Sequence, residues 1–431
     1  MNATAHAQHL LNFIDNSPSP SHAVQSIATE LKTANFIELN ETEAWHLKTG
    51  GRYYVVRDDS SLIAFIVGQK PITETGFKIA GAHTDSPTLK IKPNPVLTSD
   101  GLVRLAVEIY GGAILATFSD RDLSLAGRVC YKRDNQIKTQ LVRFDKPLLR
   151  LPNLAIHMNR NVNEDGLKLH KQNELPLILT QIVETQLPND YFATWLQQHS
   201  DIQGQPLSFD LNVYDTQKGT FWGANNEFIA DSQLDNLASC HAILTALLHD
   251  TSLNSDNTLV CSFFDHEEIG SESHKGADGN FLETVLQRIA LATEQTQENY
   301  LRALANSFMI SADMAHAYQP SFSGAYDACH KLLINQGIVI KSNANQRYST
   351  NSYSETKFIE HCEQANVPYQ RYSHRNDLAC GSTIGPMTAS RLGIHTVDVG
   401  SPLWAMHSIR ESAGVLDHHY MIQTIKQFFK L

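Results

Sequence analysis

The sequence predicts an α/β protein whose mainly parallel sheet is covered by helices, with a second, β-rich domain inserted into it. Three observations lead to this prediction. Helical and β-like segments alternate in the first and last parts of the chain, strand patterns alone fill the middle, and 431 residues exceed what one hydrophobic core usually supports. We therefore expect a discontinuous domain of residues 1–92 and 232–431, interrupted by an inserted domain of residues 93–231.

The first part of the chain predicts helices followed by strands. Residues 5–32 have helical periodicity, which an SPSP stretch at residues 17–20 interrupts. Short β-like runs follow at residues 53–56, 62–67 and 77–80. The opening segment therefore contributes both helices and strands to the larger domain.

The middle of the chain has a different pattern. From about residue 93 to residue 231, alternating polar and apolar residues are separated by turn clusters. Clear examples are residues 103–109, 123–131 and 207–213. This part is expected to form the inserted strand-rich domain.

After residue 231 the chain returns to alternating helices and strands. Residues 237–248 and 281–292 have helical patterns, whereas residues 258–264 and 308–312 are apolar runs typical of buried strands. This order favours a parallel sheet with helical crossovers.

Composition and charge exclude several classes of protein. The chain is 42% hydrophobic and 18% charged and contains no run of roughly 18 apolar residues, so we expect no membrane span. Its formal net charge of -11 disfavours nucleic-acid binding, which depends on Lys and Arg neutralising phosphates. A soluble globular protein is expected.

Cysteine usage and the first residues predict a cytoplasmic protein. The six cysteines form no CxxC pair, which favours reduced thiols over disulfides or a thiolate zinc site. The opening residues show no basic segment followed by an apolar run and a cleavage site, so secretion is not expected. Twenty histidines are many for this length, and most of them are expected to be ordinary surface or core residues.

Two candidate metal-binding positions occur early in the pattern of strands and helices. His83 in GAHTDSP follows an apolar run, and Asp85, two residues later, is suitable for orienting a metal-bound imidazole. A lone histidine after a strand is more often an ordinary hydrogen-bonded turn residue. Asp235 in ADSQLDNLAS opens an apolar helix, where an acid stabilised by the helix dipole is an equally good interpretation.

Further candidates follow the later strands. Glu267 and Glu268 in FFDHEEIGSES come directly after a buried strand, and adjacent like charges usually need a cation or a shared proton, although a solvated acidic loop is the alternative. Asp313 ends a strand in SFMISADMAHA, and His407 lies in SPLWAMHSIRE. Taken together, imidazoles and carboxylates at strand ends predict a site for zinc or another divalent metal.

Sequence blocks along nearly the whole chain resemble the aspartyl aminopeptidases, the M18 family of zinc peptidases. They occur in the family's order: GAHTDSP, LRLPNLAIHMNRNVNE, FIADSQLDNLASC, FFDHEEIGSES, MISADMAHA, GIVIKSNANQRYSTN, RNDLACGSTIGP and GSPLWAMHSIRE. The resemblance implies a catalytic domain of phosphorylase/hydrolase-like α/β architecture, interrupted by a β-rich dimerisation domain. It also implies a tetrahedral homo-oligomer of twelve subunits built from dimers.

The resemblance assigns two zinc ions to each subunit. It implies that His83 and Asp313 hold one zinc, that Glu268 and His407 hold the other, and that Asp235 bridges both. Cobalt and manganese tolerate the same ligand types, so the physiological metal stays open.

The same resemblance implies catalytic roles for three further residues. Asp85 orients His83, and Glu267, adjacent to a ligand, matches the family's general base. His157 matches a histidine of the inserted domain that reaches a neighbouring subunit's active site, where it contacts substrate or metal. An isolated subunit is then expected to be nearly inactive.

The expected activity is the removal of single residues from free peptide N-termini, with a preference for Asp or Glu. Such a preference needs a cation, and Lys341, Arg347 and Tyr348 in IKSNANQRYS are our candidates, although they are equally suited to pairing at a subunit contact. The segment around His330 and Lys331 departs from the family's pattern, so a different N-terminal preference stays open.

Two other functions remain as alternatives. A deacylase or carboxypeptidase would use the same metal centre on a different amide. A metal-stabilised scaffold without turnover is disfavoured, because a scaffold has no use for a base such as Glu267 beside a ligand set.

Overall fold

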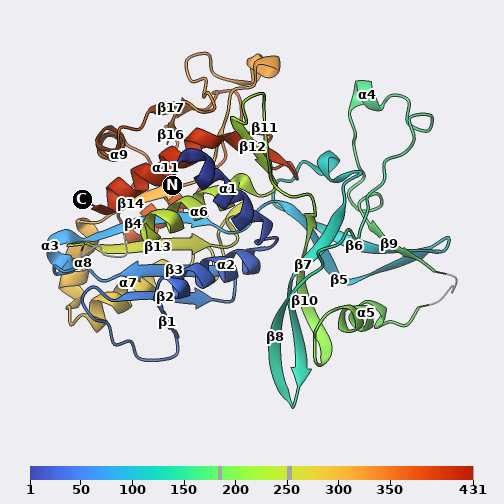
Figure 1. The fold of residues 1–431 in the computed structure, drawn as a ribbon, viewed down its shortest axis with the longest axis horizontal. Coiled ribbons are helices and arrows are strands. Elements are labelled where there is room, and N and C mark those ends of the chain that lie inside the picture. The colour runs from blue at the N-terminus through green and yellow to red at the C-terminus, as the bar shows by residue number, and fades with distance from the viewer. Residues whose placement is uncertain (183–186, 250–254, 431) are drawn as a thin grey trace. The chain divides into compact units, whose positions relative to one another are not determined.

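The computed structural model describes residues 1–182, 187–249 and 255–430, and the chain divides into two compact units (Figure 1). The first unit comprises Met1–Asp85, Gly219–Met406 and Glu411–Leu431. The second comprises Ser86–Lys218 and the short segment His407–Arg410. The structure thus divides the chain after Asp85 and Lys218, earlier than the residue 92 and 231 boundaries expected from the sequence.

Strand pairing explains both differences. β5 (Thr88–Ser99) belongs to the sheet of the second unit and runs through Pro93, because its register with β6 (Leu102–Tyr110) shifts between Ile91 and Val96. β12 (Phe228–Asp231) pairs instead with β20 (Glu411–Gly414) of the first unit. The boundaries between the two units therefore lie neither at Pro93, which is inside β5, nor at Asp231, which ends β12.

In the described residues, the largest sheet of the first unit has nine strands. Their order is β1 (Ile37–Leu39), β2 (Arg52–Arg57), β3 (Ser61–Ile66), β13 (Thr258–Phe264), β4 (Phe77–His83), β14 (Phe308–Ala312), β18 (His395–Gly400), β16 (Ile338–Ser342) and β17 (Tyr369–Ser373). The central strands β13, β4, β14 and β18 are parallel neighbours. The strands on either side of them, β3 and β16, run antiparallel to β13 and β18 respectively. The expected parallel sheet is confirmed at its centre.

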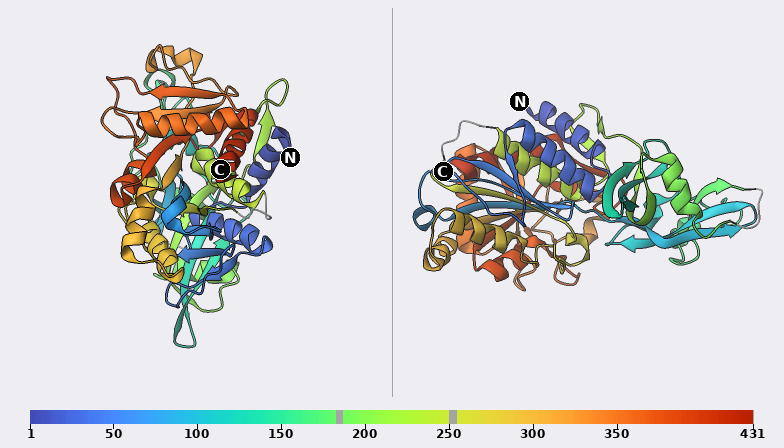
Figure 2. Two further views of the ribbon diagram at one scale, coloured as in Figure 1. Left: turned by 90° about the vertical axis from the view of Figure 1, so that its left-hand side faces the viewer. Right: turned by 90° about the horizontal axis from the view of Figure 1, so that it is seen from below.

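Helices cover both faces of this sheet (Figure 2). One apolar core is formed with α1 (Ala3–Asp15), α2 (Pro20–Thr33), α6 (Leu234–Leu248), α9 (Ser352–Ala365) and α11 (Val415–Lys430). The other is formed with α3 (Ile72–Thr75), α7 (Phe281–Ala292), α8 (Gln297–Ala305) and α10 (Ile384–Leu392). Strands buried on both faces read as continuous apolar runs, which is why β13 and β14 were recognisable in the sequence.

The N-terminal helices are separated where the SPSP stretch predicted a break. Ser19 has extended backbone angles, and its side chain accepts the backbone N–H of His22, while Pro20 occupies the first helical position. Proline is well suited to that position because its missing N–H would have no helical partner there.

A second, smaller sheet of the first unit was not expected from the sequence. In the described part of the chain it has five strands in the order β11 (Thr220–Trp222), β12, β20, β19 (Pro402–Trp404) and β15 (Ala315–His316). A 3₁₀ turn, η3 (Pro320–Ala325), follows β15. These strands are too short to leave a clear pattern of alternation.

The second unit is built on one antiparallel sheet. Its six strands in the described residues are β8 (Gln136–Arg143), β7 (Leu123–Arg133), β10 (Gln205–Asp215), β5, β6 and β9 (Leu177–Gln181). The short elements η1 (Leu115–Phe118), α4 (Val162–Asp165) and α5 (Tyr191–His199) complete it. The expected β-rich insertion is confirmed. Among the helices of the described residues, none has both the length and the apolar character needed to cross a membrane.

Candidate metal centre

Candidate ligands gather where neighbouring strands of the large sheet end. His83 is the last residue of β4, Asp313 directly follows β14, and Glu267 and Glu268 form the turn η2 (Glu267–Ile269) shortly after β13. Asp235 lies at the beginning of α6. Because β13, β4 and β14 are adjacent and parallel, their carboxyl ends meet at one edge, where ligands of α/β sheets bind.

The distances between these side chains suit a shared cation. His83 Nε2 lies 3.5 Å from Asp235 Oδ1 and 3.5 Å from Asp313 Oδ1. Glu267 Oε2 is 3.9 Å from the same nitrogen. Two ligands of a tetrahedral zinc, with bonds of about 2.0–2.2 Å, are separated by about 3.3–3.6 Å. The imidazole and carboxylates are therefore spaced as ligands around an ion, and this donor set fits zinc.

The electrostatics of the cluster support the same interpretation. Burial raises the pKa of Glu267 to about 8, and the nearby acids Asp313 and Asp235 act in the same direction. Burial likewise raises the pKa of Glu268 well above its ordinary value. Burial alone would lower the pKa of His83, but Glu267 and the neighbouring acids raise it well above the ordinary value. Without a cation, these groups must share protons to relieve the repulsion between carboxylates.

Asp85 holds both the histidine and the glutamate turn. His83 Nδ1 is 3.0 Å from the backbone oxygen of Asp85 and 3.5 Å from its carboxylate. The two carboxylate oxygens accept the backbone N–H groups of Glu267 and Glu268, each at 3.1 Å. The sequence suggested that this residue orients a ligand, but it gave no indication of the second role.

Asp235 is held just before the regular part of its helix. Asp235 lies in the first turn of α6, although Asp235 and Asn236 have non-helical backbone angles. The Asp235 N–H donates to Glu411 Oε2 at 2.9 Å, and the Asn236 side chain donates to the Ala312 carbonyl at 2.9 Å. Glu411 lies on β20, far away in the sequence, and sequence reasoning did not identify it.

Of the three proposed substrate-gripping residues, two lie next to Asp313. The Lys341 side chain is 2% exposed, and its ammonium donates to Asp313 Oδ2 at 3.2 Å and to the Met314 carbonyl at 3.1 Å. It also lies 5.1 Å from the centre of the buried Tyr348 ring. Arg347 is exposed, and its Nε donates to the Gly381 carbonyl.

His316 is a further residue that sequence reasoning missed. It lies on β15, and burial followed by the charge of Lys341 lowers its pKa to about 4, although Asp235 and Asp313 act in the opposite direction. A neutral imidazole therefore lies close to the acidic cluster. The ADMAHA segment contained it, but no strand end or spacing rule singled it out.

Two predicted site residues belong to the second unit. His157 is exposed, and nearby Leu154 and Met158 are 69% and 76% exposed. His407 opens the short segment of that unit, where its Nδ1 lies 3.2 Å from the Gly112 carbonyl and its own carbonyl accepts the N–H of Ile114. The roles of His157 and His407 at the metal centre stay predictions.

Comparison with known proteins identifies the family. The family model described as aminopeptidase I zinc metalloprotease (M18) matches residues 13–429. A protein of Ectopseudomonas mendocina (strain ymp), named a probable M18 family aminopeptidase 2, is 46% identical over 426 residues, which cover 98% of this chain and 97% of that protein.

Solved structures agree with this result. A chain in the cryo-EM structure of the Ape4 and Nbr1 complex is 36% identical with a TM-score of 0.94, and the match covers 99% of this chain and 86% of that chain. The structure of the S. cerevisiae mApe1 dodecamer matches with 29% identity and a TM-score of 0.85 over 98% of this chain and 96% of that chain. The metal-suited cluster at the strand ends and these full-length matches lead to one conclusion: the chain belongs to the M18 family of zinc aminopeptidases.

Proposed function

We propose that this aminopeptidase removes Asp or Glu from free peptide N-termini, using two zinc ions, an activated water and Glu267 as general base. The observation that carries the proposal is the convergence of His83, Asp235 and Asp313 at about ligand spacing, with the Glu267 carboxylate 3.9 Å from the same imidazole nitrogen. An ordinary acidic surface loop would leave its carboxylates in water, whereas His83 and Asp235 are buried here.

The proposed ligands divide between two ions. His83 and Asp313 would hold one zinc, Glu268 and His407 would hold the other, and Asp235 would contribute a ligand to both. The mixture of imidazole and carboxylate and the ligand-like spacing of the first group support this division. When bound, zinc supplies Lewis-acid activation of the water and of the scissile carbonyl, and cobalt or manganese would be substitutes.

Glu267 moves the proton. Its carboxylate takes a proton from the attacking water and later delivers it to the departing amine. The position of its carboxylate, 3.9 Å from the ring nitrogen of the proposed ligand His83, supports this role. The hydrogen bond from its backbone N–H to Asp85 fixes the start of the side chain.

Lys341 is the main candidate for the acidic preference. Its buried ammonium places a positive charge beside Asp313, next to the proposed metal position, where the side chain of an N-terminal Asp or Glu would be attracted. Tyr348 lies against the same ammonium, and exposed Arg347 follows as a weaker candidate for contact with substrate.

The working form of the enzyme is proposed to be a cytoplasmic homo-oligomer, a tetrahedral dodecamer built from dimers. The similarity to the mApe1 dodecamer supports this assembly. So does the exposed apolar surface of Leu154 and Met158 around His157, which is proposed to reach a neighbouring subunit's active site and contact substrate there. All six cysteines are free, in keeping with a reducing compartment.

A panel of peptides tests the proposed function. Metal analysis of the purified protein is combined with hydrolysis of matched peptides that begin with Asp, Glu, Leu or Lys, each with a free and with an acetylated N-terminus. We expect bound zinc and cleavage of free Asp and Glu peptides. A preference for Leu contradicts the acidic pocket, and cleavage of acetylated peptides indicates a deacylase or carboxypeptidase instead.

The role of Lys341 has its own test. In Lys341→Met, activity on Asp peptides is expected to fall by about tenfold or more relative to Leu peptides, because a charge-assisted contact contributes about 1.5–3 kcal/mol. Lys357→Met, which removes an exposed cation paired with Glu360, is the matched control. If activity fell equally on Asp and Leu peptides, Lys341 would support the metal site through Asp313 and would not select the substrate.

A further inference from the structure

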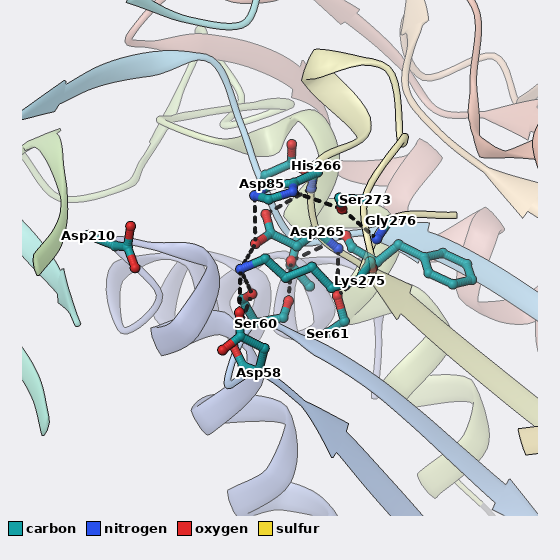
Figure 3. A network of polar contacts seen from close by, with 12 residues as sticks. Asp58, Ser60, Ser61, Asp85, Asp210, Asp265, His266, Ser273, Lys275 and Gly276 are labelled. Atoms are coloured by element: carbon teal, nitrogen blue, oxygen red, sulfur yellow. Dashed lines mark hydrogen bonds and ion pairs between the residues drawn. The ribbon is translucent and has the colours of Figure 1, made fainter. Parts of the chain in front are cut away.

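The buried side chain of Lys275 lies in a polar network with Asp58, Ser60 and Asp265 (Figure 3). The side chain of Lys275 is 11% exposed. Its ammonium lies 3.0 Å from Asp265 Oδ2 and 3.3 Å from Asp58 Oδ2, and it donates to Ser60 Oγ at 2.8 Å. An ammonium has three N–H donors, and each has an acceptor here. Burial opposes the charge, but Asp265 and Asp58 raise the pKa of Lys275, so the lysine stays protonated.

Asp265 connects this lysine to the turn. It directly follows the last residue of β13, and its Oδ1 accepts the backbone N–H of His266 at 2.8 Å. Its own N–H donates to Ser61 Oγ at 2.9 Å, and that hydroxyl donates to the Lys275 carbonyl at 2.8 Å. His266 has a left-handed φ of 66°. The contacts of Asp265 therefore set the direction in which the chain leaves the strand and enters Glu267.

The network also returns to the strand that carries His83. The hydroxyl of Thr84 donates to the Ser60 carbonyl at 2.8 Å. The next residue, Asp85, accepts the N–H groups of the glutamate turn. A continuous path therefore runs from Lys275 through Asp265 to the turn and back through Asp85, Thr84 and Ser60.

We propose that Lys275 is a positioning residue for Glu267 and Glu268. Its ammonium compensates the buried charge of Asp265, so that Asp265 remains turned inward and holds the peptide group that precedes the base. Without the ammonium, the buried Asp265 carboxylate would keep, among the described residues, only the backbone N–H and the ring of His266, whose Nε2 lies 3.6 Å away, and would turn towards water. The inference rests on the proposed function, since it assigns to Lys275 the placement of the general base and of one zinc ligand.

The test compares Lys275→Met with the wild type as the full-length assembled enzyme. We expect kcat to fall by about tenfold or more and KM to change by less than about twofold, since supporting partners of metal sites typically contribute 10–100-fold. In calorimetric titration of the metal-free protein with zinc, one of two sites should weaken by about tenfold while the stoichiometry stays the same. A role in folding alone would lower the melting temperature without this split between kcat, KM and zinc affinity.

Two further variants separate charge from packing. Lys275→Arg keeps the positive charge and is expected to retain more activity than Lys275→Met. Asp265→Asn combined with Lys275→Met removes the uncompensated charge and keeps an acceptor for the His266 N–H, so its kcat should lie between those of Lys275→Met and the wild type. Lys70→Met is the matched control, because Lys70 pairs with Asp256 at 2.7 Å but both side chains are 52% exposed.

The outcomes are distinguishable. Wild-type kcat and zinc affinity in Lys275→Met overturn the inference. If that variant does not fold, Asp265→Ala combined with Lys275→Met decides, because it buries no charge but lacks the acceptor for the His266 N–H: a reduced kcat at unchanged KM supports the inference, and a wild-type kcat overturns it. A wild-type enzyme without zinc-dependent cleavage of N-terminal residues overturns the proposed function instead, and zinc titration still reports on Lys275.

Discussion

Two clusters of titratable side chains share helix α6. They differ in how their buried groups avoid unfavourable charge: one is suited to a cation, and the other consists of neutral groups that hydrogen-bond to one another. One is the metal centre, with Asp235 at the start of the helix. The other, which we call the histidine cluster, consists of His6, His9, His241, His418 and His419 from α1, α6 and α11. In it, ring nitrogens of His9 and His241 are 2.6 Å apart, those of His241 and His418 are 2.8 Å apart, and those of His6 and His419 are 2.8 Å apart.

The two clusters shift pKa values in opposite directions. Burial, together with the neighbouring histidines, lowers the pKa of His418 to about 3 and that of His241 well below its ordinary value. Each neutral imidazole offers one donor and one acceptor, so the histidines satisfy one another without an ion. The metal centre has too many acceptors, and its acids raise each other's pKa. The identity of the neighbours, rather than burial itself, decides whether a buried cluster needs a cation.

The largest expected effect concerns the base of the metal centre. Glu267→Gln should lower kcat by about 10²–10⁴-fold, because the amide cannot carry the proton, while the zinc content stays the same. Glu272→Gln, an exposed residue of the same loop, is the control and should behave as the wild type. Full activity of Glu267→Gln would exclude it as the base.

Removal of metal should distinguish the two clusters in stability. A chelator is expected to abolish hydrolysis and to lower the free energy of unfolding by about 3–4 kcal/mol, the linkage expected for ligand at 100–1,000 times its dissociation constant. Urea unfolding with and without chelator measures this difference. Unchanged unfolding would show that the acids of the strand ends do not depend on a cation for their burial.

Acid should affect the histidine cluster. The pKa of His418 falls from 6.5 to about 3 on folding, so below pH 6.5 the unfolded chain takes up a proton that the folded chain does not. This stability is complete above the unfolded pKa and is lost as the pH falls towards the folded one, by about 2 kcal/mol at about pH 5 for His418 alone. Urea unfolding of the wild type and of His418→Gln, both metal-free, isolates this loss, because the raised pKa values of Glu267 and Glu268 affect the two proteins equally. The same change in the free energy of unfolding of both proteins between about pH 7 and 5 would contradict the prediction.

The smallest effect is expected outside both clusters. His46 is exposed, and His46→Gln should change the free energy of unfolding by less than about 0.5 kcal/mol at either pH. A larger change would mean that acid sensitivity is spread over many histidines rather than concentrated in the cluster.

The strands and the residues at their ends were predictable from the sequence, but their order was not. Apolar runs identified β13 and β14, and the residues that follow them, Glu267 and Asp313, were recognised as candidates. Only the structure shows that β4, with His83 at its end, lies between these two strands. Strand order depends on pairing between distant segments, which local periodicity does not contain.

The contacts that hold the site residues in place could not be predicted from the sequence, because they also join distant segments. Glu411 reaches Asp235 across 176 positions, and His9 meets His241 across 232 positions. The sequence showed an excess of histidines, and they were expected to be mostly ordinary surface or core residues. The buried position of Lys275 could not be predicted either, because a lysine near acids in the sequence is usually a solvated surface charge.

Substitutions of Asp85 would weaken the attachment of the glutamate turn by one or by both of its hydrogen bonds. Each of the Asp85 carboxylate oxygens accepts one peptide N–H of the turn, so an asparagine would keep one attachment and present an amide to the other, whereas an alanine would release both. Both changes also alter the contact with His83, whose Nδ1 lies 3.5 Å from the Asp85 carboxylate. Position 85 therefore adjusts the glutamate turn and the orientation of His83 together, while every proposed ligand residue stays in the chain.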